Sequence, residues 1–141
     1  MSMAKAIGGG FPMGAIAARS GLSFGRGQHA STFGGGPLAC AAALASIQAI
    51  KEEKLLERSK EMGAYFTKKL SGMARDDIVE VRGKGLMIGV EIKYPCGKFV
   101  DFAREHGVLV NCTSDSVLRL VPPLVITKEQ IDSVVDVLEQ A

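Results

Sequence analysis

The sequence predicts an α+β fold with a mostly antiparallel sheet flanked by helices, preceded by a glycine-rich segment from a different structural unit. Two observations support this. From residue 53 onward the pattern runs helix, strand, strand, helix, strand, strand, helix, and paired strands between helices are typical of an α+β layer. Residues 1–36 lack the apolar periodicity of a core, and Pro37 then suits the first turn of a helix.

The segment before Pro37 reads mainly as loop. Residues 6–13 hold three glycines and a proline, which suit neither a helix nor a strand. Residues 14–19 are short and apolar and predict a buried strand. Residues 20–36 hold six glycines and predict a long loop, and long loops in compact domains are more often functional than not.

Helices and strands follow in a regular order. The residue pattern predicts helices over 38–50, 53–70 and 98–106, and strands over 78–82, 86–92, 108–111 and 117–121. The pattern leaves open whether the first two helices are continuous, and the charged run at 51–54 is the expected joint if they are not. Gly107 is the expected end of the third helix. Thr127 and Gln130 resemble a capping box that opens a last helix.

Composition excludes several classes of protein. With 141 residues, 47% of them hydrophobic, and a net charge of +2, the chain is globular and carries no strong signal for nucleic acid or a membrane surface. It has no run of 18 apolar residues. Three cysteines without a CxxC pair make a disulfide framework or a zinc knuckle unexpected, so a reducing, cytoplasmic location is predicted.

Most familiar site motifs are absent. The glycines of residues 83–89 come close to a dinucleotide-binding fingerprint, but a strand follows where a helix is needed, so a hairpin with close packing is predicted. His29 and His106 lack carboxylates at suitable spacing, and no metal site is predicted. A Ser-His-Asp site stays open from the sequence, although no nucleophile elbow is present.

The first 50 residues contain no Asp or Glu, which favours an anion bound by glycine-rich backbone. A loop that happens to lack acids is the simpler explanation of that feature alone. Lys5 adjoins the three glycines, and a lysine in a dry, tightly packed place can lose its proton and attack a carbonyl. The alternative is a solvated lysine near a chain end, which is the usual case.

Four segments resemble, in order and spacing, the motifs of class III pyridoxal-phosphate aminotransferases. Residues 3–15 (MAKAIGGGFPMGA) resemble the lysine motif of that family, and residues 28–39 (QHASTFGGGPLA) resemble its second signature. Residues 81–89 (VRGKGLMIG) and 118–124 (LRLVPPL) resemble two more. The resemblance spans essentially the whole chain and is closest to the branch of the family that acts on N-acetylornithine.

The resemblance assigns roles to particular residues. Lys5 would hold pyridoxal 5'-phosphate covalently and shuttle a proton during catalysis. Ser31 and Thr32 would contact the cofactor phosphate of a partner subunit, and hydroxyl groups in a glycine-rich loop are good phosphate donors. Arg119 would bind a substrate carboxylate, although alternation along its strand favours solvent. Gly36 departs from the family, which usually has Asn there.

The resemblance also implies an organisation. Residues 1–36 would be a fragment of the large cofactor-binding domain, 37–72 connecting helices, and 73–141 a small C-terminal domain of fold type I. Because family members are roughly three times longer, we expect this C-terminal third of the enzyme to be inactive alone. The parent would move an amino group from N-acetylornithine or ornithine to 2-oxoglutarate in arginine biosynthesis, as a homodimer. An ornithine or 4-aminobutyrate aminotransferase, a non-catalytic interaction module and a structural domain without a ligand remain alternatives.

Overall fold

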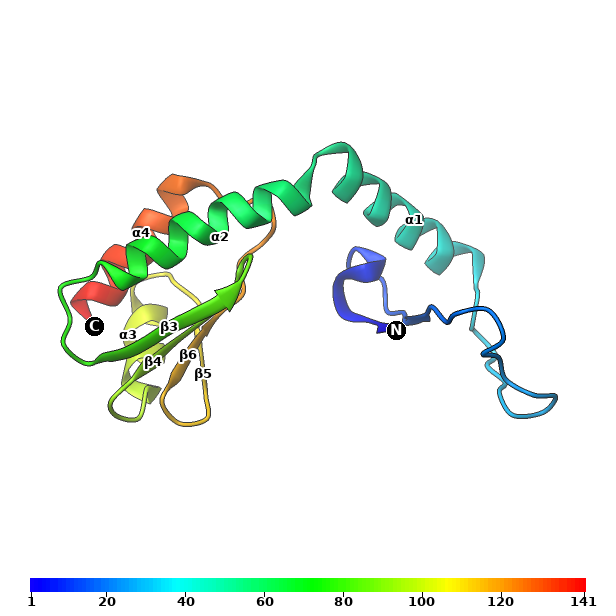
Figure 1. Cartoon of the computed structure of the whole chain (residues 1–141), viewed down its shortest axis with the longest axis horizontal. Coiled ribbons are helices and arrows are strands. Elements are labelled where there is room, and N and C mark those ends of the chain that lie inside the picture. The colour runs from blue at the N-terminus through cyan, green and yellow to red at the C-terminus, as the bar shows by residue number, and fades with distance from the viewer. The chain divides into compact units, whose positions relative to one another are not determined.

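The computed structural model describes residues 1–141 (Figure 1). The chain divides into two units, Met1–Lys54 and Leu55–Ala141. Each unit is described by itself below. The predicted division into residues 1–36, 37–72 and 73–141 concerns the domains of a longer enzyme and stays a prediction.

The first unit holds one long helix and very little else that is regular. Its elements are β1 (Ser2–Met3), the 3₁₀ helix η1 (Lys5–Gly8), β2 (Ala15–Ile16) and α1 (Pro37–Glu52). A strand lies within the predicted range 14–19, but it has only the two residues of β2, and the expected burial is wrong because Ile16 is 67% exposed. The expected loop over 6–13 is wrong in part, since η1 occupies its beginning.

Residues 20–36 form no helix or strand, as predicted. The sequence places the end of the first long helix at the charged run, and the structure confirms this. Helix α1 ends at Glu52, and the backbone of Lys54 takes a left-handed φ of 52° before α2 begins. A non-glycine residue in that region cannot continue a right-handed helix, so the helical hydrogen bonds stop there.

The second unit is a two-layer α+β structure (Figure 1). Its elements are α2 (Leu55–Ser71), β3 (Ile78–Lys84), β4 (Met87–Ile92), α3 (Gly97–Glu105), β5 (Asn111–Thr113), β6 (Val117–Leu120) and α4 (Lys128–Gln140). The strands are antiparallel and lie in the order β3-β4-β6-β5. The predicted antiparallel sheet with helices is confirmed, but the strand expected over 108–111 is shifted to 111–113, where pairing with β6 begins.

One face of this sheet carries the core. Alternate residues of β4 and β6 are almost fully buried, among them Ile88 and Leu118 at 1% and 2% exposure. They pack with Phe66 of α2 and Ile131 of α4, which are equally buried. Because side chains of a strand alternate between faces, the residues between them point to the other side. That second face is called the open face below; Arg119 lies on it and is exposed.

The β3–β4 hairpin packs against α2 through glycine. A Cβ added to Gly63 would lie 2.1 Å from the carbonyl oxygen of Gly85, so only glycine allows this approach. Gly85 itself has a left-handed φ of 56° at the turn. The near-fingerprint of residues 83–89 is therefore a hairpin with close packing, as the sequence predicted.

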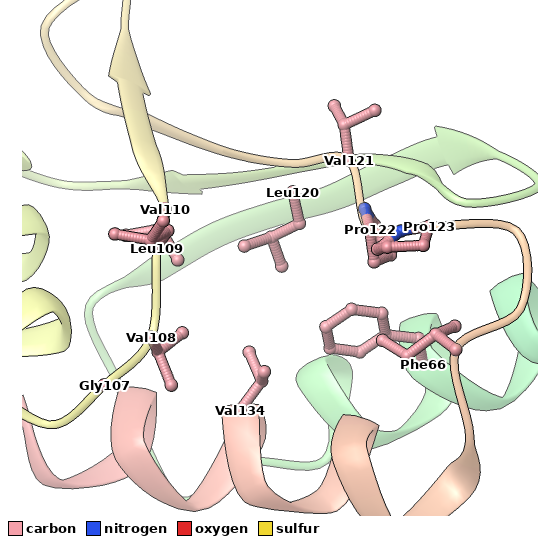
Figure 2. Close-up of a pocket in the computed structure, with 11 residues that line it drawn as sticks. Phe66, Gly107, Val108, Leu109, Val110, Leu120, Val121, Pro122, Pro123 and Val134 are labelled. Atoms are coloured by element: carbon pink, nitrogen blue, oxygen red, sulfur yellow. The ribbon is translucent and has the colours of Figure 1, made fainter. Parts of the chain in front are cut away.

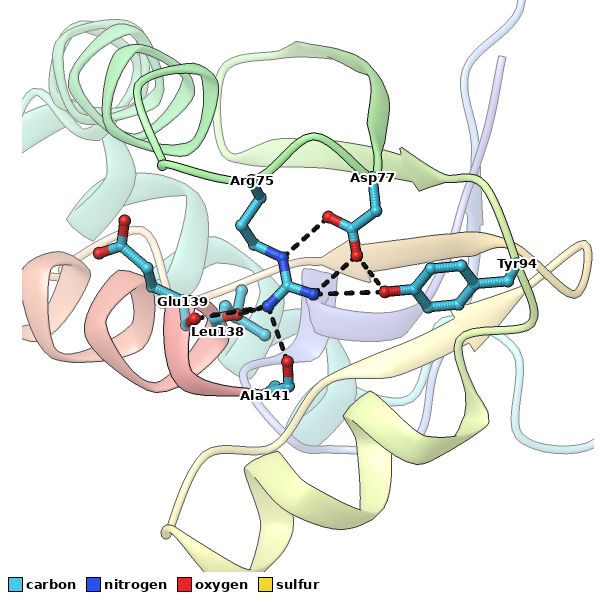
Figure 3. A network of polar contacts seen from close by, with 6 residues as sticks. All are labelled: Arg75, Asp77, Tyr94, Leu138, Glu139 and Ala141. Atoms are coloured by element: carbon cyan, nitrogen blue, oxygen red, sulfur yellow. Dashed lines mark hydrogen bonds and ion pairs between the residues drawn. The ribbon is translucent and has the colours of Figure 1, made fainter.

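A buried ion pair ties the start of β3 to the end of α4 (Figure 3). Arg75 donates to both carboxylate oxygens of Asp77 at 2.9 and 2.7 Å, and to the carbonyl oxygens of Leu138 and Ala141 at 3.0 and 2.7 Å. The Tyr94 hydroxyl also donates to Asp77. The guanidinium of Arg75 holds the pKa of Asp77 well below its usual range, despite the opposing effect of burial.

The structure contains a disulfide between Cys96 and Cys112, so the expectation of free cysteines is wrong. Cys96 precedes α3 and its N–H donates to the carbonyl oxygen of Asp115 at 2.7 Å, in the turn that follows β5. This contact brings two cysteines 16 residues apart within 5.7 Å, measured between Cα atoms. The spacing along the chain gave no sign of it, because the pair is set by tertiary packing. Cys40 remains free.

Candidate functional site

Lys5 lies in a strained backbone conformation at the start of η1. Its φ is 60°, in the left-handed region that side chains other than glycine rarely adopt. Strain of this kind persists where the surrounding structure enforces it and is frequent at functional sites. The side chain is exposed within the chain, so the dry surroundings expected from the sequence are absent here. Lys54, just after α1, is also exposed and has a left-handed φ of 52°, so neither burial nor this backbone conformation alone marks Lys5 as functional.

Glycines fix the segment around Lys5 against α1. Gly8 is buried, and a Cβ there would lie 2.9 Å from the Met13 side chain. A Cβ on Gly9 would lie 2.7 Å from the hydroxyl of Ser46 on α1. The backbone of Gly9 therefore lies close against α1, and η1, which begins at Lys5, packs on that helix.

Ser31 lines a hollow of about 680 Å³ in the first unit. Gly34 and Gly35 also line it, together with Ser2 and Met3 of β1. A Cβ on Gly34 would lie 2.9 Å from the Ser31 side chain, so the loop curls around this hydroxyl as only glycine permits. Residues 1–50 contain no Asp or Glu, so no carboxylate of this segment would repel an anion in the hollow. Thr32 adjoins Ser31 but does not line the hollow.

Gly36, the position where the family usually has Asn, is the N-cap of α1. No side chain caps this helix end. Asn is among the preferred N-cap residues because its side chain accepts from the free N–H groups of the first turn. The departure therefore removes a helix cap in this chain and touches no group assigned to catalysis.

Arg119 lies in the middle of the open face of the sheet. It pairs with Gly89 of β4 on one side and with Asn111 of β5 on the other. Because Gly89 has no side chain, a shallow hollow of about 310 Å³ forms there, lined by Arg119 and Arg82 among others. Arg119 is exposed, as alternation predicted, and it takes part in no ion pair of the chain. Its guanidinium is free to bind a carboxylate.

Arg82 is the residue of this face whose environment the sequence analysis missed. Its guanidinium contacts the carboxylates of Glu80 and Glu91 at 2.7 and 2.6 Å. The two carboxylates raise the pKa of Arg82 above its ordinary value, with Glu91 the larger influence. The spacing of two residues between Glu80 and Arg82 along β3 places both on one face and could have predicted their contact. The contact with Glu91 could not be predicted without the register of the hairpin.

The second unit also contains an apolar pocket of about 360 Å³ at the edge of its core (Figure 2). Phe66, Val134, Leu120 and the segment Gly107–Val110 line it, with the prolines that follow β6. The lining contains no titratable side chain. The pocket therefore offers apolar packing surface and no side chain that could act as acid, base or nucleophile.

The candidate residues fall in both units. Lys5, Ser31 and Thr32 belong to the first unit and Arg119 to the second. No group of three or more His, Cys, Asp and Glu side chains is placed to hold a metal ion. No helix of the chain is long and apolar enough to cross a bilayer.

Solved aminotransferases share this fold. The acetylornithine aminotransferase of Elizabethkingia anophelis superposes with a TM-score of 0.87 at 36% identity, over 99% of this chain and 39% of that one. The ornithine δ-aminotransferase of Plasmodium falciparum gives a TM-score of 0.90 at 35% identity, over 99% of this chain and 38% of that one. The α+β arrangement is therefore that of part of a fold-type I aminotransferase.

Sequence comparison defines the family. Residues 1–141 match the family described as "Aminotransferase class-III", and the chain belongs to it. It is 89% identical, over its whole length, to 36% of the acetylornithine aminotransferase of Methanosarcina acetivorans. The acetylornithine aminotransferase of Methanothermobacter thermautotrophicus is 52% identical over 97% of the chain and 36% of the relative. The chain thus spans about a third of the length of these relatives.

Proposed function

We propose that this chain supplies part of the active site of an acetylornithine aminotransferase that uses pyridoxal 5'-phosphate. The identity of 89% with the Methanosarcina acetivorans relative carries the proposal, because it covers every residue of the chain. In the reaction, an amino group leaves N-acetylornithine and replaces the keto oxygen of 2-oxoglutarate. The donor becomes an aldehyde and the acceptor becomes glutamate. The arginine-biosynthesis role belongs to this proposal.

Lys5, Ser31 and Thr32 would serve the cofactor. The amine of Lys5 would hold it and later carry the proton that moves at the substrate carbon. The hydroxyls of Ser31 and Thr32 would donate to its phosphate, and the curled glycine loop around Ser31 supports this role. When bound, pyridoxal phosphate supplies an electron sink for the carbon that loses its proton.

Arg119 would bind the carboxylate of the amino-acid or oxo-acid substrate. Its exposure and its freedom from ion pairs support this role. A guanidinium matches a carboxylate with two parallel hydrogen bonds, which fixes orientation as well as charge. The contact would hold the substrate while Lys5 moves the proton.

A homodimer forms part of the proposal, since Ser31 and Thr32 would face the cofactor of a partner subunit. The large apolar side chains of the first unit support an assembly, because Phe33 and Leu38 are 89% and 68% exposed within the chain. A cytoplasmic location also belongs here. The disulfide between Cys96 and Cys112 removes the support that the cysteine pattern gave to a reducing compartment.

The test uses a hybrid enzyme: the full-length Methanosarcina acetivorans relative in which this chain replaces the segment that it matches. The hybrid should transfer the amino group of N-acetylornithine to 2-oxoglutarate. Lys5→Ala should abolish transfer, because the amine that holds the cofactor and moves the proton is gone. Lys54→Ala is the matched control, since Lys54 is also exposed with a left-handed φ of 52°, and it should leave activity unchanged.

Arg119→Ala in the hybrid should lower kcat/KM about 10- to 150-fold, the loss of a charge-assisted hydrogen bond of about 1.5–3 kcal/mol. Arg119→Lys keeps the positive charge but loses the two parallel N–H donors of the guanidinium, so kcat/KM should stay clearly below the wild-type value. A folded hybrid without activity, or wild-type kinetics for Lys5→Ala, would contradict the proposed function. Ornithine preferred over N-acetylornithine would instead indicate the ornithine branch of the family.

A further inference from the structure

We infer that Arg82 is a positioning residue that keeps Glu91 away from Arg119, so that Arg119 stays free to bind the substrate carboxylate. The inference rests on the proposed role of Arg119 and extends it to three neighbours. It follows from the register of the open face, from the observed ion pairs and from the like charges that face each other there.

The strand register places Glu91 within side-chain reach of two arginines, Arg82 and Arg119. Arg82 and Arg119 lie directly opposite Gly89, on the strands to either side of β4. Glu91 is two residues along β4 and points to the same face. It is therefore a diagonal neighbour of both arginines, about 7–8 Å away on the backbone and within reach of long side chains.

In the structure, Glu91 forms an ion pair with only one of these two arginines. Its carboxylate contacts Arg82 at 2.6 Å, whereas Arg119 forms no ion pair. The stem of Arg82 lies close to Gly89, since a Cβ on that glycine would be 4.0 Å from the Arg82 Cγ. A Cβ at that distance would make only an ordinary van der Waals contact, so the pairing of Arg82 with Glu91 follows from the strand register and not from the missing side chain of Gly89.

Repulsion between the carboxylates of Glu80 and Glu91 would change the position of the Glu91 side chain if Arg82 were absent. Glu80 and Glu91 lie directly opposite each other on β3 and β4, and like charges at opposite positions destabilise a sheet. Arg82 bridges both carboxylates at 2.7 and 2.6 Å and removes this repulsion. Without the bridge, Glu80 would repel Glu91, and Arg119 is the other arginine within diagonal reach of the Glu91 carboxylate. An intramolecular carboxylate would then compete with the substrate for the same guanidinium.

The kinetic test uses Arg82→Gln in the hybrid enzyme. Competition from Glu91 affects the free enzyme, so KM for 2-oxoglutarate should rise about 10-fold while kcat changes less than twofold. Arg82→Gln/Glu91→Gln removes the competitor and should bring KM back to within about twofold of the wild type. Arg82→Lys keeps a cation between the carboxylates and should be intermediate. Arg104→Gln, which breaks the exposed pair with Asp101, is the matched control and should have no effect.

A second measurement needs neither cofactor nor turnover. In the 141-residue chain, the ¹H–¹⁵N resonance of the Arg119 side chain should shift in Arg82→Gln and return in the double variant. If Arg119→Ala impairs the hybrid but Arg82→Gln has wild-type KM and an unshifted Arg119 resonance, the positioning role is wrong and the proposed function stands. If Arg119→Ala has wild-type kinetics, the substrate role of Arg119 itself fails. A double variant as impaired as Arg82→Gln would show that Arg82 acts through folding and would overturn the inference.

Discussion

The two units of this chain use their residues in opposite ways. In Leu55–Ala141, apolar side chains of α2, α3, α4 and the sheet form one buried cluster. In Met1–Lys54, the only buried apolar side chain is that of Ala43, and large apolar residues such as Phe33 and Ile16 are exposed. The unit that carries Lys5, Ser31 and Thr32 thus has almost no core of its own.

The difference in buried apolar area separates the unit with a core of its own from the unit that carries Lys5, Ser31 and Thr32. The second unit follows the rule that buried apolar area drives folding. The first unit is instead rich in glycine turns, and its glycines approach neighbouring groups closely without burying much apolar area. Its order must therefore depend on contacts beyond those that residues 1–54 make among themselves.

The largest expected effect comes from a pair of identical substitutions, one in each unit. Phe66 is 1% exposed and Phe33 is 89% exposed. Phe66→Ala should lower the free energy of unfolding by about 3–5 kcal/mol, because it removes buried contacts and leaves a cavity. Phe33→Ala should change it by less than about 0.5 kcal/mol. Urea unfolding of the 141-residue chain measures both, and equal effects would mean that the first unit has a core that this structure does not show.

The next effect concerns the ion pair between Arg75 and Asp77. Asp77→Ala removes the carboxylate that pairs with the partly buried Arg75 guanidinium, and should cost about 1.5–3 kcal/mol of unfolding free energy. Asp101→Ala, which breaks the exposed pair with Arg104, is the control and should cost less than about 0.5 kcal/mol. Unfolding curves at pH 7 compare the two.

The same aspartate predicts a pH dependence. Because the pKa of Asp77 is lower in the folded state than in the unfolded state, its contribution to stability is present above the unfolded value, near pH 4. It is lost progressively as the pH falls further and the carboxylate is protonated. The midpoint of thermal unfolding should therefore drop on acidification below about pH 4, and less steeply in Asp77→Ala. Parallel pH profiles for the two proteins would contradict this.

The smallest effects compare the helix starts of the two units. Helix α4 has a full capping box, in which Thr127 accepts from the Gln130 N–H and Gln130 accepts from the Thr127 N–H. Thr127→Ala should cost about 1 kcal/mol of unfolding free energy. Gly36→Asn would add a cap to α1 and should gain only a few tenths of a kcal/mol, against a tight contact of 3.2 Å between the new Cβ and the Phe33 carbonyl oxygen. Thermal unfolding checks the signs, which should be opposite.

Periodicity predicted most of the second unit because its elements are amphipathic. The two-residue alternation of β4 and β6 and the capping box of α4 are local signals, and the structure confirms them. Periodicity could not predict contacts between residues that are far apart in the sequence. The disulfide joins Cys96 to Cys112, and Tyr94 meets Asp77 across 17 residues, so neither has a local pattern.

The sequence supplied the candidate residues of the site but not their geometry. The motif around Lys5 drew attention to the lysine, but no local pattern predicted its left-handed backbone or its exposure. Alternation placed Arg119 on the exposed side of its strand, while its freedom depends on Arg82 and the hairpin register. The roles of Lys5, Ser31, Thr32 and Arg119 stay predictions that the hybrid enzyme tests.

The disulfide has a practical consequence for studying the first unit. With Cys96 and Cys112 bonded to each other, the exposed Cys40 on α1 is the one free thiol of the chain. A fluorescent or spin label that reacts with thiols would therefore attach at a single position without any engineered cysteine. That position lies in the unit that lacks a core, one turn after the start of α1. The chain thus carries a built-in reporter for the ordering of its glycine-rich half.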